Sequence, residues 1–489
     1  MRYLPALLLL VVVTAVCLPF SAADDSRTFK DTSNSKDKGP RPVVALQAPP
    51  MGFMSWERFR CQIDCAKFPK ECINENLYME MGTALVQGGY AAAGYKQVSI
   101  DDCWTSGRDP STHELLADPH RFPSGIPALA KFLHDQDLQL GIYGDAGTLT
   151  CGGYAGSQGY EQVDAQTFAD WGVDYLKLDG CYVGDFAKAY QAFGQALRMA
   201  GPTRPIVFSC SWPAYLGSNE SAKPYHDMYY EAGCNTWRNY GDIDNTWDTL
   251  LAIIIHWADY WKDLQAVPQG SVNDADMLLI GDDHHGKRLP LNQAQVQMTF
   301  WAMIANPLFI AADVRTIPDD YGQILKNAHV IAINQDASLR QAGCVVGCRG
   351  TPQQEQQQDS NHVQVWSKSL QSGESHALAF FNLNNNSTSS SIVYTFPVQG
   401  AIARCVDLWS PDPETDVCDQ GRGATTELWD IRVITDNDNN NKDDQVFLQI
   451  HALNVPPTSQ RLLRIDYFCS STTATTTSEN DTGIELEVD

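Results

Sequence analysis

The sequence predicts an α/β fold, a (β/α)8 TIM barrel followed by a C-terminal antiparallel β-sandwich. Three observations predict the barrel: short apolar runs alternate with helical stretches, the runs end in polar or charged clusters, and eight of them follow one another. The runs are 48–57, 97–102, 138–145, 173–181, 205–212, 236–242, 274–277 and 307–313. Helical segments such as 76–88 and 185–199 lie between them. The active site of such a barrel lies at the carboxyl ends of its strands, where these polar clusters fall.

A doubly wound open sheet is the competing α/β interpretation. Neither a G-x-G-x-x-G nor a G-x-x-x-x-G-K-[ST] motif follows a predicted strand. Nucleotide binding is therefore unsupported, and the barrel is favoured.

The length and composition predict two folded domains. At 489 residues, with 43% hydrophobic residues, the chain is too long for one ordinary domain and can fill large cores. We expect a signal peptide at 1–23, a disordered leader or propeptide at 24–44, the barrel at 45–340, the sandwich at 341–469 and a flexible tail at 470–489. The alternating segments of the sandwich are 362–368, 376–383, 391–397, 402–409, 446–451 and 461–468.

Charge and cysteine content indicate the compartment and exclude some partners. A net charge of −25 and a pI near 4.7 argue against nucleic acid and anionic membranes, and they fit a protein used in an acidic compartment. The signal peptide, 14 cysteines and sequons at Asn219, Asn385, Asn386 and Asn480 predict a lysosomal or secreted protein. Cys17 would leave with the signal peptide, so an odd number of cysteines would remain, one of them free or paired between chains.

The fourth run carries the strongest chemical signal, because it ends on Lys177, Asp179 and Gly180. Asp179 could simply cap the next helix or pair with Lys177, but a carboxylate at the end of a buried strand is costly unless it has a function. Lys177 lies two residues earlier and shares its face, which favours an ionised Asp179 that acts as a nucleophile. Asp242 ends the sixth run, and a pair of carboxyl groups across a barrel rim suits the cleavage of a glycosidic bond.

Other residues at the predicted strand ends suit a sugar. Trp56, Tyr143 and Trp212 offer flat apolar faces, and hydrogen-bonding side chains come from Asp101, Asp102, Lys177, Arg238 and Asp276. Taken singly, aromatic residues usually belong to the core, and an acidic pair is usually a solvated loop or a helix cap. Their shared position at strand ends favours a sugar site.

Four motifs resemble glycoside hydrolase family 27, which contains the lysosomal α-galactosidases and α-N-acetylgalactosaminidases. They are PPMGFMSWERF at 49–59, IDDCW at 100–104, FADWGVDYLKLDGC at 168–181 and INQD at 333–336, and the resemblance runs from about 46 to 340. It implies a retaining mechanism in which Asp179 is the nucleophile and Asp242 the acid/base. Retention predicts that their carboxyl groups lie roughly 5–5.5 Å apart.

The same resemblance implies further roles. Asp101 and Asp102 would hold O4 and O6, Lys177 and Arg238 the ring hydroxyls, and Trp56, Tyr143 and Met277 the pocket wall, with Tyr215 and Asp276 also binding substrate. Disulfides are implied for Cys61 with Cys103, Cys65 with Cys72, Cys151 with Cys181, and Cys210 with Cys234. We also expect Cys344 with Cys348 and Cys405 with Cys418, which would leave Cys469 unpaired. A glycosylated homodimer is implied, and neither a cofactor nor a metal.

The loop after the fifth run is expected to determine which sugar the site accepts. Similar α-galactosidases have a glutamate and a leucine where Ser211 and Ala214 stand. The smaller side chains leave room for an acetamido group, so α-linked N-acetylgalactosamine is favoured. A merely looser pocket that still prefers galactose is the alternative, and a roomy pocket rejects a smaller sugar weakly. Secondary α-galactosidase activity is therefore expected.

Two departures from the family pattern are expected to affect the rim of the pocket. Val272 and Ala275 replace a usual tryptophan and proline, and the loop 281–288 is longer than usual. Both would influence the aglycone. His284 and His285 in this loop could suggest a metal, but neighbouring histidines without other ligands at suitable spacing favour an exposed loop.

Two other functional classes remain as alternatives. The first is an aldolase that forms a Schiff base on Lys177, which requires a lysine of lowered pKa with few acidic neighbours. The second is a secreted lectin that has kept the sugar pocket and lost turnover.

Overall fold

A computed structural model describes residues 44–201, 204–351, 362–370, 375–385, 389–397, 402–411, 416–417, 424–425, 429–435 and 446–467. The predicted signal peptide, all of the predicted leader except Val44, and the predicted tail lie outside the described residues. So do Asn386 and Asn480 of the predicted sequons.

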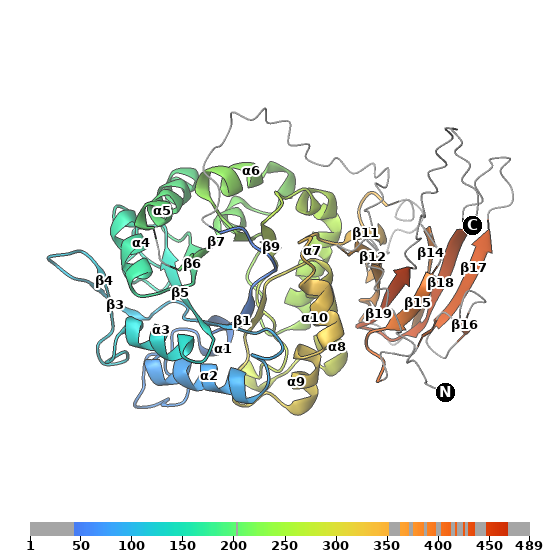
Figure 1. Cartoon of the computed structure of the whole chain (residues 1–489), viewed down its shortest axis with the longest axis horizontal. Coiled ribbons are helices and arrows are strands. Elements are labelled where there is room, and N and C mark those ends of the chain that lie inside the picture. The colour runs from blue at the N-terminus through green and yellow to red at the C-terminus, as the bar shows by residue number, and fades with distance from the viewer. Residues whose placement is uncertain are drawn as a thin grey trace, which may run out of the picture.

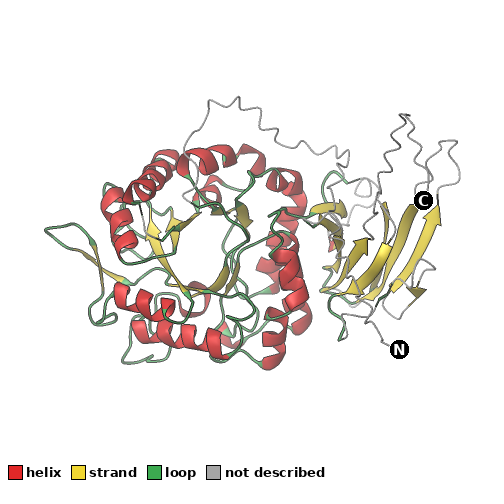
Figure 2. Ribbon diagram, in the orientation of Figure 1, coloured by secondary structure: helices red, strands yellow, loops and turns green. Residues whose placement is uncertain are grey.

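A closed parallel barrel forms the larger part of the molecule and confirms the predicted fold class (Figures 1 and 2). Its eight strands pair in the order β10-β1-β2-β5-β6-β7-β8-β9. A parallel bridge between Leu278, just after β9, and Ile310 in β10 joins the two ends of the sheet. The strands are β1 (Met51–Met54), β2 (Gln97–Ser99), β5 (Gln139–Asp145), β6 (Tyr175–Asp179), β7 (Val207–Cys210), β8 (Thr236–Arg238), β9 (Val272–Asp274) and β10 (Leu308–Ile310).

Helices surround the barrel, as Figure 2 shows. They are α1 (Trp56–Phe59), α2 (Glu75–Gln87), α3 (Ile126–His134), α4 (Glu161–Asp170), α5 (Phe186–Ala200), α6 (Tyr225–Asp227), α7 (Trp247–Gln265), α8 (Leu291–Met303), α9 (Asp319–Leu325) and α10 (Ala328–Asn334). Shorter helical turns are η1 (Trp212–Leu216), η2 (Glu220–Ala222), η3 (Met228–Ala232) and η4 (His284–Gly286).

Local side chains set where the two predicted helices begin. The side chain of Asn74 accepts a hydrogen bond from the Leu77 N–H at 2.9 Å and starts α2, and Asp185 accepts from the Lys188 N–H at 3.1 Å and starts α5. Such N-caps satisfy amide groups that have no partner in the first turn. Asp185, and not Asp179, therefore caps the helix that follows the fourth run.

The seventh strand lies two residues earlier than predicted. It covers Val272–Asp274, because Asp276 takes a left-handed conformation with φ of 79° and ends the extended backbone.

A hairpin of β3 (Thr105–Arg108) and β4 (Leu115–Ala117) was not predicted. β3 is polar (TSGR) and β4 has only three residues (LLA), so neither forms the longer apolar run on which the prediction depended.

Two antiparallel sheets follow the barrel, as predicted. One has the order β11-β12-β13-β19-β15 and the other the order β14-β18-β17-β16. Their strands are β11 (Gly343–Val346), β12 (Val363–Ser369), β13 (Ser375–Asn382), β14 (Ser390–Pro397), β15 (Ile402–Asp407), β16 (Ala424–Thr425), β17 (Trp429–Thr435), β18 (Val446–Val455) and β19 (Ser459–Tyr467). The six predicted segments each correspond to a strand, whereas β11, β16 and β17 were not predicted.

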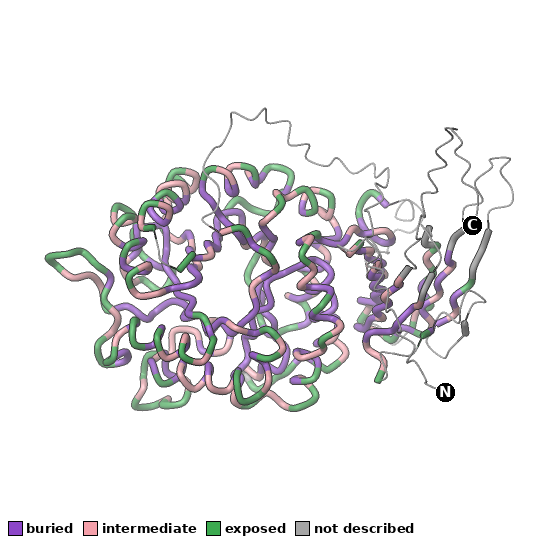
Figure 3. Tube along the Cα trace, viewed as in Figure 1, coloured by how far each residue is buried: buried purple, intermediate pink, exposed green. Residues whose placement is uncertain are grey.

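The barrel and the sheets share a packed interface, drawn as buried chain in Figure 3. The ring of Phe300 in α8 lies 5.1 Å from that of Trp366 in β12 and 5.9 Å from that of Phe381 in β13. The indole N–H of Trp409 donates to Thr299 Oγ1 at 2.9 Å. Lys368 of β12 is also buried here, and its Nζ donates to Ile333 O at 2.6 Å and to Ala302 O at 3.3 Å.

Disulfides link segments of the barrel and also join the first strand of the antiparallel sheets to the turn after it. The structure contains the pairs Cys61–Cys103, Cys65–Cys72, Cys151–Cys181, Cys210–Cys234 and Cys344–Cys348, each of which was expected. Cys405 is also disulfide-bonded, while Cys418, its predicted partner, and Cys469 lie outside the described residues. Disulfides in this number indicate folding in an oxidising compartment. None of the helices that the structure describes is long and apolar enough to cross a membrane.

Candidate active site

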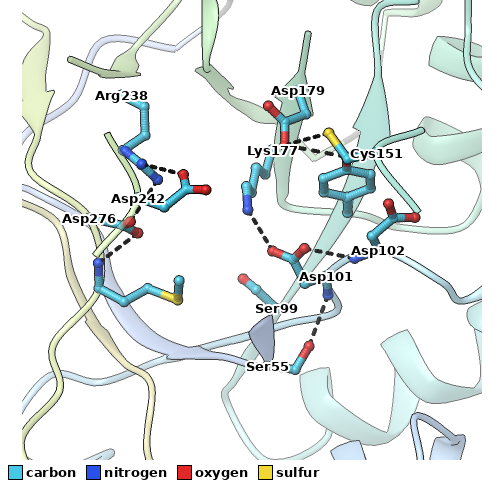
Figure 4. A network of polar contacts seen from close by, with 12 residues as sticks. Ser55, Ser99, Asp101, Asp102, Cys151, Lys177, Asp179, Arg238, Asp242 and Asp276 are labelled. Atoms are coloured by element: carbon cyan, nitrogen blue, oxygen red, sulfur yellow. Dashed lines mark hydrogen bonds and ion pairs between the residues drawn. The ribbon is translucent and has the colours of Figure 1, made fainter. Parts of the chain in front are cut away.

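The carboxyl ends of the strands bring the predicted sugar-site residues together around one cavity at the mouth of the barrel. Lys177, Ser211, Arg238, Asp276 and Met277 line it. Figure 4 shows Asp101 and Asp179 on one side of Lys177, and Arg238, Asp242 and Asp276 facing it from the other side.

An apolar cluster forms the floor of this cavity. Met54, Tyr175, Met277 and Phe309 are buried together, and Trp56 packs against them while half-buried. Of the predicted aromatic residues, Trp56 lies at the site through this cluster, and Tyr143 lies there through its hydrogen bond to Asp179. Trp212 does not: it is buried and stacks on Tyr190 with ring centroids 5.7 Å apart, so its prediction as a sugar platform is wrong. It is the first residue of η1 and packs against α5, which carries Tyr190.

Lys177 forms its direct ion pair with Asp101, with Nζ 2.7 Å from Oδ2. Burial would lower the pKa of Lys177, but the carboxylates of Asp101, Asp179 and Asp276 outweigh burial and raise this pKa above its usual range. The sequence predicted that Lys177 would act mainly on Asp179. The structure differs, because the lysine reaches Asp101 on the neighbouring side of the mouth and influences Asp179 only through space.

Asp179 accepts hydrogen bonds from two tyrosines and one backbone amide. Tyr215 donates to its Oδ1 at 2.7 Å, Tyr143 donates to its Oδ2 at 3.3 Å, and the Gly180 N–H lies 3.1 Å from Oδ1. Burial, and then the charge of Asp179, raise the pKa of both tyrosines above the usual range. Both hydroxyls therefore keep their protons and fix the orientation of the Asp179 carboxylate.

Arg238 joins Asp242 to Asp276. Its Nη2 lies 2.7 Å from Asp242 Oδ1, and its Nη1 lies 2.8 Å from Asp276 Oδ2. The guanidinium of Arg238 lowers the pKa of Asp242, whose side chain is 86% exposed at the mouth. Asp242 is thus an accessible carboxylate, and it can take up a proton more readily once Arg238 turns to another partner.

The acidic pair after β2 is buried, and its two carboxylates have different partners. Asp101 binds Lys177, whereas Asp102 accepts the Cys103 N–H at 2.6 Å and the Gly152 N–H at 2.7 Å. Burial raises the pKa of Asp102. These carboxylates are therefore part of the mouth and not a solvated loop, and Asp102 also holds the loop that carries the Cys151–Cys181 disulfide.

The loop after β7 places Ser211 and Tyr215 differently. Ser211 is buried and lines the cavity, Ala214 is half-buried one turn further on, and Tyr215 is exposed above Asp179. The small side chain of Ser211 thus lies on the cavity wall, and the Tyr215 hydroxyl reaches the Asp179 carboxylate.

Several residues of the mouth were not predicted. Asp274, Ser209 and Tyr175 line the cavity, and burial raises the pKa of Asp274 to about 6. Their alternation along β6, β7 and β9 is a signal in the sequence that could have identified them, because inward-facing positions recur every second residue.

Two buried carboxyl groups near the mouth were also missed. Burial raises the pKa of Glu57 and of Asp145 to about 8 each, and neither side chain is exposed. Glu57 Oε2 lies 2.6 Å from Arg60 Nη2. Asp145 accepts hydrogen bonds from the Gly147 N–H at 2.8 Å and from the Cys181 N–H at 3.0 Å. Nothing in the sequence marks a carboxyl group as buried, so only the structure could identify them.

The two departures from the family pattern lie in different places. Val272 starts β9 and packs with Leu46 and Leu339 at the amino end of the strands, so its prediction as a rim residue is wrong. The strand begins two residues earlier than predicted, which moves Val272 away from the mouth. Ala275 is buried, and its N–H donates to Asn306 Oδ1, a bond that a proline would lack.

The loop 281–288 lies at the mouth end of the barrel. Asp283 Oδ1 lies 3.3 Å from Nε of Arg58 in α1. Asn245, which follows β8, donates a hydrogen bond from its Nδ2 to Lys287 O at 2.9 Å. His284 is half-buried, which differs from the exposed position that we predicted. Among the described residues, the one group of three potential metal ligands is Asp145, Cys151 and Cys181, and both sulfurs belong to a disulfide.

Comparison with known proteins gives a consistent set of relatives. The signature of the family described as alpha galactosidase A matches residues 48–336, which include all eight barrel strands. Alpha-N-acetylgalactosaminidase from Gallus gallus is 41% identical over 376 residues, covering 74% of this chain and 87% of that protein. Alpha-galactosidase A from Homo sapiens is 40% identical over 341 residues, covering 69% of this chain and 74% of that protein.

A solved structure is similar over most of the chain. The crystal structure of alpha-galactosidase I from Mortierella vinacea has a TM-score of 0.64 and 26% sequence identity, and the match covers 87% of this chain and 98% of that one. The likeness therefore extends beyond the barrel into the antiparallel sheets.

Proposed function

The chain belongs to the alpha galactosidase A family, glycoside hydrolase family 27, and is a glycoside hydrolase; we propose that it removes terminal α-linked N-acetylgalactosamine from glycoconjugates with retention of configuration. A weaker α-galactosidase activity is part of this proposal. The relatives named as α-N-acetylgalactosaminidase and as α-galactosidase support both substrates.

In the proposed first step, an Asp179 oxygen forms a bond to the anomeric carbon while the glycosidic C–O bond breaks. Asp242 gives its proton to the departing oxygen. In the second step, Asp242 removes a proton from water, the water oxygen bonds to the anomeric carbon, and the Asp179 carboxylate leaves. Two displacements at the same carbon retain its configuration.

The ion pairs at the mouth support a division of roles. Asp242 needs a proton before it can act as an acid, and its contact with Arg238 opposes protonation. A sugar hydroxyl that takes over the Arg238 contact would release Asp242 for proton uptake. Lys177 and Asp101 would hold ring hydroxyls as one charged pair, and Tyr143 and Tyr215 would orient Asp179 for attack.

The observation that carries the choice of sugar is the buried position of Ser211 on the cavity wall. Its short side chain and that of Ala214 leave space that a glutamate and a leucine would fill. An acetamido group placed there can accept a hydrogen bond from the Ser211 hydroxyl and pack its methyl group on Ala214.

The test compares p-nitrophenyl α-N-acetylgalactosaminide with p-nitrophenyl α-galactoside from pH 4 to pH 7. We expect a higher kcat/KM for the first substrate, and we expect Ser211→Glu combined with Ala214→Leu to reverse the preference by roughly 10²-fold or more. A preference of the wild type for galactoside would contradict the proposed specificity. Release from neither substrate by folded protein would favour the lectin alternative.

The proposal also includes a lysosomal or secreted glycosylated homodimer. The disulfides and the likeness to the named relatives support entry into the secretory pathway. Sedimentation of the secreted protein at micromolar concentration would detect the dimer.

A further inference from the structure

We propose that a groove beside α7 seats the first sugars of an N-linked glycan carried by Asn219. The groove has a volume of about 550 Å³, a size at which pockets hold small ligands. It is lined by Asn219 and Ser221 of the sequon, by residues 259–263 of α7 and by Arg349. None of these residues lines the cavity at the mouth of the barrel.

The sequon is held firmly against α7. Its middle residue, Glu220, is buried and contacts Lys223 Nζ and His256 Nε2 at 2.7 Å each, and it also accepts a bond from the Tyr225 hydroxyl. The Ser221 hydroxyl donates to Asp263 Oδ2 at 3.0 Å. Because Glu220 and Ser221 are anchored, the position of Asn219 relative to the groove is fixed.

The side chain of Asn219 is available for modification. Asn219 is exposed at the start of η2, and its side chain makes no capping hydrogen bond to that turn. An N-cap asparagine normally uses its side chain to satisfy the first amides of a helix. Here the amide is exposed, makes no capping hydrogen bond and borders the groove, so a sugar can be attached to it.

The α7 residues that line the groove have the chemistry that binds a sugar. Trp261 is half-buried, and its indole N–H donates to Arg349 O at 3.3 Å, which holds the ring in place. Lys262 lies with Nζ 5.3 Å from the centre of that ring, and Tyr260 and Asp259 are half-buried beside it. An aromatic ring packs against the C–H face of a pyranose, while the charged groups can hydrogen-bond its hydroxyl and acetamido groups.

The chain's own glycan fits this groove better than a free sugar does. Glycan transfer in the secretory pathway forms a bond between Asn219 Nδ2 and the anomeric carbon of the first sugar. The bond from that carbon to the pyrophosphate of a lipid-linked donor breaks, and the amide loses one proton. A sugar tethered at the edge of the groove has a high effective concentration there, so weak contacts suffice to seat it.

The test uses the full chain secreted from animal cells. Peptide mass spectrometry should find Asn219 glycosylated, and peptide N-glycosidase acting on the folded protein should release this glycan roughly fivefold to tenfold more slowly than the glycan at Asn385. Trp261→Ala should bring the two release rates close together. Leu116→Ala, at an exposed position on the β3–β4 hairpin, should change neither rate.

Two results would overturn the proposal: an unmodified Asn219, or release from Asn219 as fast as from Asn385 and unaffected by Trp261→Ala. Digestion of the unfolded protein should release both glycans at similar rates, which separates the groove from the sequon itself. If Trp261→Ala is not secreted, Lys262→Ala at an exposed position should change the release rate in the same direction.

Discussion

The mouth of the barrel holds a half-buried lysine and the interface between the barrel and the antiparallel sheets a fully buried one, and the two lysines behave in opposite ways. At the mouth, carboxylates around Lys177 raise its pKa. At the interface, burial lowers the pKa of Lys368 to about 7. Within the described residues, its Nζ donates hydrogen bonds only to uncharged carbonyl oxygens, those of Ile333 and Ala302. Burial therefore does not decide the charge of a lysine by itself; the neighbouring charges do.

Neither of these two lysines fits the aldolase alternative. A Schiff-base lysine needs a lowered pKa and access to its substrate. Lys177 has the access but a raised pKa, and Lys368 has the lowered pKa but is 1% exposed. Neither meets both conditions, in agreement with the glycoside hydrolase family to which the chain belongs.

The largest expected effect comes from Asp179→Asn at the mouth. Loss of the nucleophile should lower kcat by roughly 10⁴-fold or more, while product binding remains measurable by calorimetry. Asp185→Asn, at an exposed cap where asparagine serves equally well, should keep full activity. Unchanged activity in Asp179→Asn would overturn the assigned role.

Lys177→Met should have the next largest effect. It leaves the buried Asp101 carboxylate without its cation, so we expect kcat/KM to fall roughly 10²- to 10³-fold and stability to fall by about 3 kcal/mol or more. Lys177→Arg keeps the charge and should retain more stability. Equal losses in both variants would mean that the shape of lysine, and not its charge, is what the mouth requires.

The buried carboxyl groups near the mouth should make the protein more stable in acid. Glu57 has a folded pKa of about 8 against an ordinary value of 4.5, so its stabilising contribution is complete below about pH 4.5 and is lost as the pH rises toward 8. Thermal unfolding should show a melting temperature lower by roughly 5 °C or more at pH 8 than at pH 5.

Glu57→Gln should reduce that difference, because glutamine does not titrate. Glu114→Gln, at an exposed position, should leave it unchanged. If Glu57→Gln loses as much stability between pH 5 and pH 8 as the wild type, Glu57 is not one of the groups responsible.

Lys368→Met at the interface should have the smallest effect on activity, with kcat/KM within about twofold of the wild type, since this lysine lies outside the mouth. The unfolded chain holds the lysine proton up to about pH 10.5 and the folded one only up to about pH 7, so the contribution of Lys368 is lost as the pH falls through this window. The stability deficit of the variant, measured by chemical denaturation, should therefore grow from pH 6 to pH 9. A deficit that grows toward acid would contradict the lowered pKa.

Much of the fold was predictable because its signals are local. Seven of the eight barrel strands overlap the predicted runs closely, since a buried parallel strand needs an apolar run of limited length. The hairpin of β3 and β4, and the strands β16 and β17, were missed because they are short or lie between segments without a clear alternation.

The site was predictable only as a set of residues at strand ends. Asp101, Lys177, Asp179, Arg238, Asp242 and Asp276 lie together at the mouth because parallel strands of a closed barrel end at one face. Trp212 and Val272 were misplaced, because a shift of one or two residues changes which side or which end of the barrel a side chain occupies.

The sequence by itself determined the barrel, the order of its strands and the chemical groups available at their ends, because alternation of apolar and polar residues is a property of neighbours along the chain. The tertiary structure alone decided which charge meets which: Lys177 binds Asp101, Arg238 divides itself between Asp242 and Asp276, and two tyrosines orient Asp179. Partners of this kind come from different strands and loops, and the distance and burial that set their energies exist only once the chain has folded.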